Sequence, residues 1–298
     1  MAEKKLKTLI PSEKRSQKDY IDETEPDTDY IELGKHSKPE FTRSALVEKE
    51  RPTLNQPLLV MGLPGIGFVS KLAADHLVKT LKGKHFATLY SPHFPNQVLA
   101  MRTGRLRPFT MKFYYTRTKN RDLIVLRGDL QPLTVEGQYE VTAQILQYAA
   151  SLGSGEVMAM AGYALNQKVD KPSIYCTATS KAQFNKYVKM GCKRNDAIVP
   201  IIGLAGLVPA LAPLYGLTGS CLLVETPGTG IDANGSTALI EFLSKVLGHK
   251  IETIHLRDRA AKAADLAKKI EEQTRSAEER KMVGTPEQIK RETLTYIR

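Results

Sequence analysis

The sequence predicts an α/β protein in which one sheet is covered by helices on both faces. Two observations lead to this prediction. Short apolar runs of strand length alternate with longer segments whose apolar residues recur at helical spacing, as in α/β folds. The run at 57–61 also leads through a turn rich in Gly and Pro into a helical pattern over 66–81. Such strand–turn–helix units begin many α/β domains that hold a phosphate at a helix N-terminus.

The remaining elements of the core follow by the same criteria. Further strands are expected near 85–90, 97–103, 110–117, 122–127, 156–161, 172–178 and 220–225. Further helices are expected near 135–151, 180–190 and 233–247. The last of these helices has the clearest limits, because Asp232 is a good N-cap and Gly248 a good terminating residue.

Charge and composition divide the chain into three parts. The net charge is +11, and residues 51–248 alone hold 21 Lys and Arg against 11 Asp and Glu. Residues 1–50 are polar and have few periodic apolar positions, so we expect a disordered tail there. The α/β core domain is expected over 51–250 and a helical extension over 251–298.

The segment 197–224 contains no charged residue and is long enough to span a bilayer. Three prolines and four glycines interrupt it, and each proline would break a membrane helix. We therefore expect a loop, a short buried helix and a buried strand, with no membrane association. The N-terminus leads into no apolar run, so no signal peptide is expected and the protein is predicted to be cytoplasmic.

The helical extension carries a repeating pattern of small and apolar residues. They are spaced alternately four and three apart, which forms a weak heptad seam. The seam consists of Leu256, Ala260, Ala263, Ala267, Ile270, Thr274 and Ala277. Two interpretations remain open, because such a helix packs either on its own core or on another subunit.

Residue types that carry chemistry form no complete catalytic or metal-binding set. The three cysteines make no CxxC pair, the six histidines make no HExxH pair, and no GxSxG nucleophile motif is present. No metal and no cofactor are therefore expected. The cysteines are interpreted as reduced core residues.

The turn after the first core strand resembles two phosphate-binding motifs without completing either. Gly62 and Gly67 have the spacing of a phosphate loop, but Phe68 stands where the motif requires Lys. The dinucleotide motif begins at Gly65, but its third glycine is replaced by Ser70. We interpret the glycines as residues that allow a tight turn and close packing of the helix against the strand.

Two carboxylates follow predicted strands and are candidates for a site. Asp129 comes directly after the strand near 122–127, and Glu225 ends the strand near 220–225. If these strands are neighbours, the two residues would line a cleft where α/β proteins usually bind ligands. Each carboxylate could be a base, a metal ligand or a cap for its own turn. Two carboxylates alone do not define a reaction.

A basic stretch crosses the predicted strands between 102 and 127. It contains Arg102, Arg105, Arg107, Lys112, Arg117, Lys119, Arg121 and Arg127, with only Asp122 opposing them. Nucleic-acid binding is one interpretation, but no recognised nucleic-acid-binding fold accompanies the stretch. A surface for an acidic protein partner is favoured instead.

Four short motifs, taken together and in order, resemble the proteasome assembly chaperone family in its archaeal branch, which is related to the second eukaryotic assembly chaperone. The resemblance covers about residues 55–250. The motif residues are Gly62, Pro64, Gly65 and Gly67, then Asp129, Gln131 and Pro132, then the run Gly203 to Leu207, then Glu225, Pro227 and Gly228.

The resemblance implies a phosphorylase/hydrolase-like α/β fold with a mixed sheet and no established catalytic role. It also implies a homo-oligomer whose C-terminal tails dock into pockets of the 20S proteasome α-ring. In the family the docking motif has a penultimate Tyr after a hydrophobic residue. Here Tyr296 is followed by Ile297 and Arg298 and preceded by Thr295, so the pattern is displaced by one position.

The leading hypothesis is a non-enzymatic assembly chaperone or regulator that binds proteasome α-subunits, with Tyr296, Ile297 and Arg298 as anchor. The alternative is an enzyme acting on a nucleotide, nucleoside or carboxylate, either ligase-like with ATP or phosphorylase-like. That enzyme would have its site near Gly65, Asp129 and Glu225. A third hypothesis is nucleic-acid binding through 102–127.

Overall fold

The computed structural model of the chain describes residues 42–101, 103–167, 169–195, 199–258 and 260–261. These residues fall within one compact unit, Glu32–Ala261. The predicted tail up to residue 41, the extension beyond 261 and the anchor at Tyr296, Ile297 and Arg298 lie outside the described residues.

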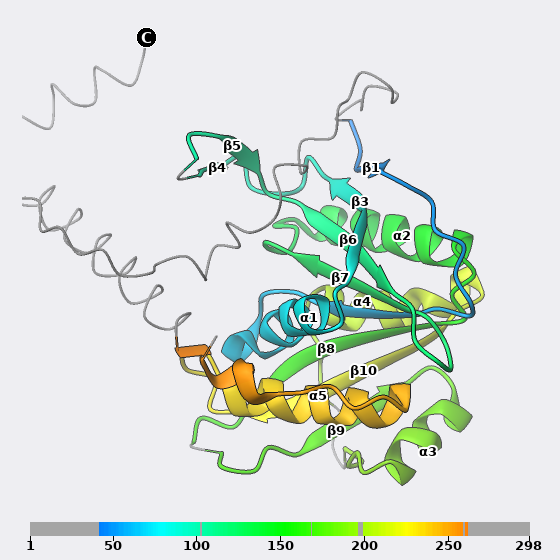
Figure 1. Ribbon diagram of the computed structural model, residues 1–298, viewed down its shortest axis with the longest axis vertical. Coiled ribbons are helices and arrows are strands. Elements are labelled where there is room, and N and C mark those ends of the chain that lie inside the picture. Colours follow the sequence, from blue (N-terminus) through cyan, green and yellow to red (C-terminus); the bar gives the residue numbers. More distant parts are fainter. Residues whose placement is uncertain (1–41, 102, 168, 196–198, 259, 262–298) are drawn as a thin grey trace, which may run out of the picture. The chain divides into compact units, whose positions relative to one another are not determined.

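The described residues form a mixed eight-stranded sheet in the order β1-β3-β6-β7-β2-β8-β10-β9 (Figure 1). Its strands are β1 (Ala45–Glu48), β2 (Leu58–Gly62), β3 (Lys84–Tyr90), β6 (Met111–Thr116), β7 (Leu123–Gly128), β8 (Glu156–Ala164), β9 (Ile174–Ala178) and β10 (Thr218–Thr226). A separate hairpin consists of β4 (Val98–Ala100) and β5 (Leu106–Pro108). The predicted α/β class with a mixed sheet is therefore confirmed for this part of the chain.

In the described part of the chain, α-helices and short 3-10 segments accompany the strands. The helices are α1 (Val69–Thr80), α2 (Val135–Ser151), α3 (Lys181–Lys189), α4 (Leu204–Leu211) and α5 (Ala233–Leu247), and the 3-10 segments are η3 (Ile66–Phe68) and η4 (Ala212–Tyr215). Figure 1 shows α1 and α5 side by side on one face of the sheet, with α2 and α4 on the other.

The central strands are parallel and alternate their side chains between two cores. β2 pairs in parallel with β7 and β8, and β8 pairs in parallel with β10. In β2, Leu58 and Val60 belong to the core under α1 and α5, whereas Leu59 and Met61 belong to the core under α2 and α4. This period of two buries every residue of β2, as expected for a strand covered on both faces.

Helix caps account for the limits that the sequence predicts best. Thr134 Oγ1 accepts a hydrogen bond from Gly137 N (3.0 Å) at the start of α2. Asp232 Oδ1 accepts from the backbone N–H groups of Asn234 (2.9 Å) and Gly235 (3.1 Å) at the start of α5. α5 ends at Gly248, which adopts a left-handed conformation with φ of 61°. The predicted limits of both helices are confirmed.

Two elements depart from the expected boundaries. β1 pairs antiparallel with β3, so the sheet begins before residue 51, where the core domain was predicted to start. The Val47 side chain is buried, and this burial stabilises β1 at the edge of the sheet. β5 lies within the basic stretch and was not predicted at all.

The described part of the uncharged segment, 199–224, folds as a loop, the short helices α4 and η4, and the buried strand β10, as predicted. Among the described residues, no helix is both long and apolar enough to cross a membrane. Two residues of the predicted heptad seam, Leu256 and Ala260, are buried in the core under α1 and α5. The described start of the extension thus packs on the chain's own core.

Candidate functional site

Four sequence motifs meet at one edge of the sheet. β7, β2, β8 and β10 are parallel, so their carboxyl ends lie along the same edge. The turn from Leu63 to Gly67 follows β2, the segment from Asp129 to Pro132 follows β7, and Pro227 and Gly228 follow β10. Carboxyl ends of parallel strands are the usual location of ligand sites in α/β sheets.

The glycines of the first turn allow close packing. A Cβ atom on Gly62 would lie 2.2 Å from the carbonyl oxygen of Ser70 in α1. Gly67 has φ of 64°, and a Cβ atom there would lie 2.4 Å from Thr226 Oγ1. The turn is therefore pressed against both α1 and the end of β10, as the interpretation of a tight turn expects.

Gln131 joins three segments at this edge. Its Nε2 atom donates a hydrogen bond to the carbonyl oxygen of Pro64 (2.9 Å), and its Oε1 atom accepts one from Leu204 N (3.1 Å). One side-chain amide thus connects the first turn, the segment after β7 and the first residue of α4. We refer to Pro64, Gln131 and Leu204 as the Gln131 junction. Gly203 leaves room for it, since a Cβ atom there would lie 2.6 Å from Gln131 Oε1.

Asp129 is held in an ion pair beside this junction. Arg107 Nη1 and Nη2 donate to its two carboxylate oxygens at 2.6 and 3.1 Å, and Thr110 N donates at 3.0 Å. Burial by itself would raise the pKa of Asp129, but the hydrogen bonds and charge of Arg107 outweigh it and hold the pKa below its ordinary value. The ionised carboxylate fixes the β5 segment to the end of β7 and is poorly suited to act as a base.

Glu225 has an equivalent structural function at the other side of the edge. Its carboxylate accepts hydrogen bonds from Ser173 N (2.8 Å) and from the Tyr175 hydroxyl (3.0 Å). Desolvation would raise the pKa of Glu225, but these hydrogen bonds lower it below the ordinary value. Glu225 therefore ties the start of β9 to the end of β10.

The two carboxylates do not share a cleft. β2 and β8 lie between β7 and β10 in the sheet. Three strand spacings correspond to about 14 Å. The condition for a shared cleft, that the two strands are neighbours, is therefore not met, and the sequence does not specify the strand order that decides it.

The remaining motif residues form the turns of this edge. Pro132 is buried, and its carbonyl oxygen accepts from Gln138 Nε2 (3.4 Å). Gly228 has φ of 84° and follows Pro227 in the turn that leaves β10. Gly65 has open space where a Cβ atom would be, so close packing does not explain it.

An exposed apolar residue stands close in the sequence to each member of the Gln131 junction, and sequence reasoning missed these residues. Ile66, Leu133 and Ile202 are each two residues from a member of the junction, and they are 50%, 71% and 87% exposed. Apolar side chains presented together on a well-supported surface are typical of protein-binding sites. The available signal was their position inside or beside the Gly- and Pro-rich motifs, where loop residues are usually polar.

The basic stretch is dispersed rather than continuous. Arg107 pairs with Asp129 at the carboxyl edge, Arg121 pairs with Glu156 at 2.9 Å at the amino ends of the strands, and Arg127 pairs with Asp75 at 3.1 Å. These partners neutralise cations that a nucleic-acid site would direct at phosphates. The geometry therefore gives the nucleic-acid hypothesis no support.

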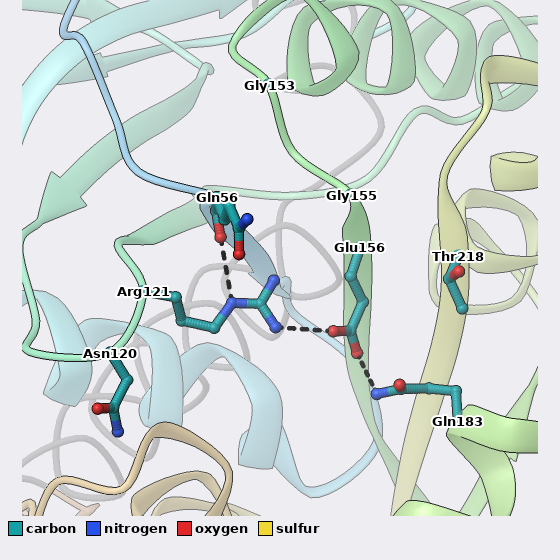
Figure 2. A pocket seen from close by; sticks show the side chains of 8 residues that line it. All are labelled: Gln56, Asn120, Arg121, Gly153, Gly155, Glu156, Gln183 and Thr218. Atoms are coloured by element: carbon teal, nitrogen blue, oxygen red, sulfur yellow. Dashed lines mark hydrogen bonds and ion pairs between the residues drawn. The ribbon is translucent and has the colours of Figure 1, made fainter.

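A cavity of about 500 Å³ opens at the opposite edge, among the amino ends of the strands (Figure 2). It is lined by Gln56, Asn120, Arg121, Gly153, Gly155, Glu156, Gln183 and Thr218. Glu156 accepts hydrogen bonds from Arg121 Nη1 (2.9 Å), Gln183 Nε2 (2.6 Å) and the Tyr187 hydroxyl. This network binds β8 to α3 and was not predicted, although an acidic residue at the start of an apolar strand was a visible signal. In the described part of the chain, no group of three or more residues is arranged to hold a metal ion.

The fold and the carboxyl edge define a class: an α/β domain whose motif carboxylates have structural partners and whose motif loops present apolar side chains. The PAC2 family model matches residues 59–273. The chain belongs to the PAC2 family.

Several archaeal proteins are similar to this chain. The Methanocaldococcus jannaschii protein MJ1210 is 34% identical over 227 residues, which cover 74% of this chain and 86% of that protein. The crystal structure of Pyrococcus furiosus PbaB, an archaeal proteasome activator, matches with a TM-score of 0.70 and 34% identity over 77% of this chain and 99% of that one. Pyrococcus furiosus PbaA, an archaeal homolog of proteasome-assembly chaperone, matches with a TM-score of 0.65 and 25% identity over 79% and 99%.

Proposed function

We propose that this protein is a non-enzymatic assembly chaperone or activator that binds the α-ring of the 20S proteasome. The similarity to an archaeal proteasome activator over nearly the whole of that chain supports the partner. One observation supports the mode of action: the conspicuous carboxylates of the motifs, Asp129 and Glu225, are engaged in structural contacts. The same edge exposes Ile66, Leu133 and Ile202, as a protein-binding surface would.

Two parts of the chain would contact the proteasome. The first is the Gln131 junction with its three apolar side chains. The second is the anchor at Tyr296, Ile297 and Arg298, where an aromatic side chain suits insertion into a pocket. A homo-oligomer would present several copies of both parts, and the resulting avidity would compensate for weak single contacts. The protein would act in the cytoplasm.

A co-sedimentation assay with archaeal 20S particles tests this proposal. We expect the full-length chain to sediment with the particles and the variant lacking residues 294–298 to bind at least tenfold more weakly. The double variant Leu133→Ser with Ile202→Ser is expected to weaken binding to a similar degree. Leu214→Ser is the matched control, because Leu214 is an equally exposed apolar residue outside the junction.

The outcomes separate the parts of the proposal. If the full-length chain does not bind 20S particles, the proposed function is wrong. Full binding after removal of residues 294–298 would contradict the anchor alone. If Leu214→Ser weakens binding as much as the double variant, the effect is a general loss of apolar surface and the Gln131 junction is not the contact.

A further inference from the structure

Two of the three cysteines lie beside each other at the outer edge of the sheet. Cys176 is in β9, and Cys192 follows the end of α3. The chain after α3 runs along β9, where Lys193 N donates to the carbonyl oxygen of Ile174 (2.7 Å) and Cys176 N donates to that of Lys193 (3.2 Å). Lys193 therefore forms a parallel bridge with Tyr175.

This bridge directs both thiols to the same side. The Lys193 ammonium lies over the Tyr175 ring, 5.9 Å from its centroid, so these two side chains occupy one face. Because side chains alternate along an extended chain, Cys176 and Cys192 occupy the opposite face. Both are buried in the same core under α1 and α5, where each thiol shifts the pKa of the other.

The two sulfur atoms differ in acidity. The neighbouring Cys192 thiol is the main cause of a lowered pKa at Cys176, and the charge of Arg194 lowers it further. The neighbouring Cys176 thiol is in turn the main cause of a raised pKa at Cys192. Cys221 is not part of this arrangement, and burial raises its pKa to about 12. The lower pKa makes Cys176 the attacking thiol of the pair and leaves Cys192 as the resolving thiol.

We propose that Cys176 and Cys192 form a redox modification site, at which a peroxide produces an intramolecular disulfide between β9 and the chain that follows α3. The Cys176 thiolate attacks one peroxide oxygen, the O–O bond breaks, and the departing hydroxide takes a proton to become water. Cys176 is then a sulfenic acid. The Cys192 sulfur displaces its hydroxyl group, which leaves with the Cys192 proton as a second water. Two thiols are oxidised to one disulfide, and one peroxide is reduced to two waters.

The bond would tie α3 to the edge of the sheet. The loop that it closes contains 15 residues and includes the whole of α3. Closing such a loop restricts the unfolded chain and stabilises the folded one. The strand that carries Cys176 also carries Tyr175, which holds Glu225 at the carboxyl edge. Oxidation would therefore reinforce one end of that edge, and this inference does not depend on proteasome binding.

The experiment exposes the folded full-length chain to hydrogen peroxide and measures its intact mass and free thiols. We expect the mass to fall by two hydrogen atoms, the number of free thiols to fall from three to one, and dithiothreitol to reverse both changes. The melting temperature of the oxidised chain should rise by several degrees. Peptide mapping of the unsubstituted protein should find Cys176 linked to Cys192, which requires no variant to fold.

Variants supply the controls. Cys221→Ser is expected to form the disulfide as the parent does, whereas Cys176→Ser and Cys192→Ser are expected to form none. Unchanged mass, oxygen addition without a disulfide, or a disulfide that links two chains would each overturn the proposal. A disulfide that includes Cys221 would overturn it as well.

Discussion

The two edges of the parallel strands use charged residues in the same way but leave different surfaces. At the carboxyl edge, Asp129 and Glu225 are engaged in contacts with neighbouring segments, and exposed apolar side chains stand in the same loops. At the amino edge, Glu156 and Arg121 form a pair that lines a polar cavity. The comparison teaches that a charged residue in a motif is not by itself a functional residue. The side chains that stay exposed after the charged residues have formed their contacts determine what the edge can bind.

The largest expected effect lies at the amino edge. Replacing Glu156 with Ala leaves Arg121 and the Tyr187 hydroxyl without their shared acceptor. Breaking such a buried pair from one side costs about 3–5 kcal/mol of folding free energy. Urea unfolding at neutral pH measures it.

Glu252→Ala is the control for this substitution. Glu252 pairs with Lys250 at 2.9 Å, but both side chains are largely exposed. Its loss should change the unfolding free energy by no more than about 0.5 kcal/mol. Equal effects of the two substitutions would mean that the pair at the amino edge is not a structural element.

The next effect concerns the Gln131 junction. Gly203 has φ of 81° and ψ of −164°, a region open almost only to Gly, and a Cβ atom would approach Gln131 Oε1. Gly203→Ala should therefore cost about 1–3 kcal/mol. Gly216 has φ of 73° with open space around it, so Gly216→Ala tests strain without the contact and should cost less. Differential scanning calorimetry compares the two, and the reverse order would contradict the role of the junction.

How far the sequence predicts the molecule depends on the range of the interactions involved. The limits of α2 and α5 follow from Thr134, Asp232 and Gly248, which act on their own neighbours. The positions of Asp129 and Glu225 depend on β2 and β8 lying between their strands, which only tertiary packing decides. Glu156 could not be paired with Arg121 from the sequence, since 35 residues separate them. β1 escaped notice because it is only four residues long, has Val47 as its one buried residue, and runs directly into the charged residues Glu48 to Glu50.

A smaller effect on the free energy of unfolding is expected when the pH is lowered into the acid range. The pKa values of Asp129 and Glu225 in the folded protein lie below their ordinary values of 3.8 and 4.5. Their contribution to stability is therefore complete above those ordinary values and is lost as the pH falls through the lower folded-state values. In Asp129→Asn the unfolding free energy should fall less steeply in this acid range. Urea unfolding at a series of pH values measures it, and an unchanged acid dependence would contradict the ion pair with Arg107.

The smallest effect on stability is expected at Leu133, which belongs to the proposed contact with the proteasome. Leu133 is exposed and supports no core residue, so Leu133→Ser should change the unfolding free energy by at most about 0.5 kcal/mol. Thermal unfolding checks this directly. A larger loss would mean that Leu133 supports the fold, and the carboxyl edge would then resemble the amino edge.

The Gln131 junction also has a consequence for folding order. Its two hydrogen bonds join residues that are 67 and 73 positions apart in the chain. Contacts of such long range form only after the intervening sheet and helices have been assembled. The Leu204 amide should therefore exchange its hydrogen only through opening on the scale of the whole domain. A partner that recognises the surface around Gln131 would bind fully folded molecules and would not bind incompletely folded ones.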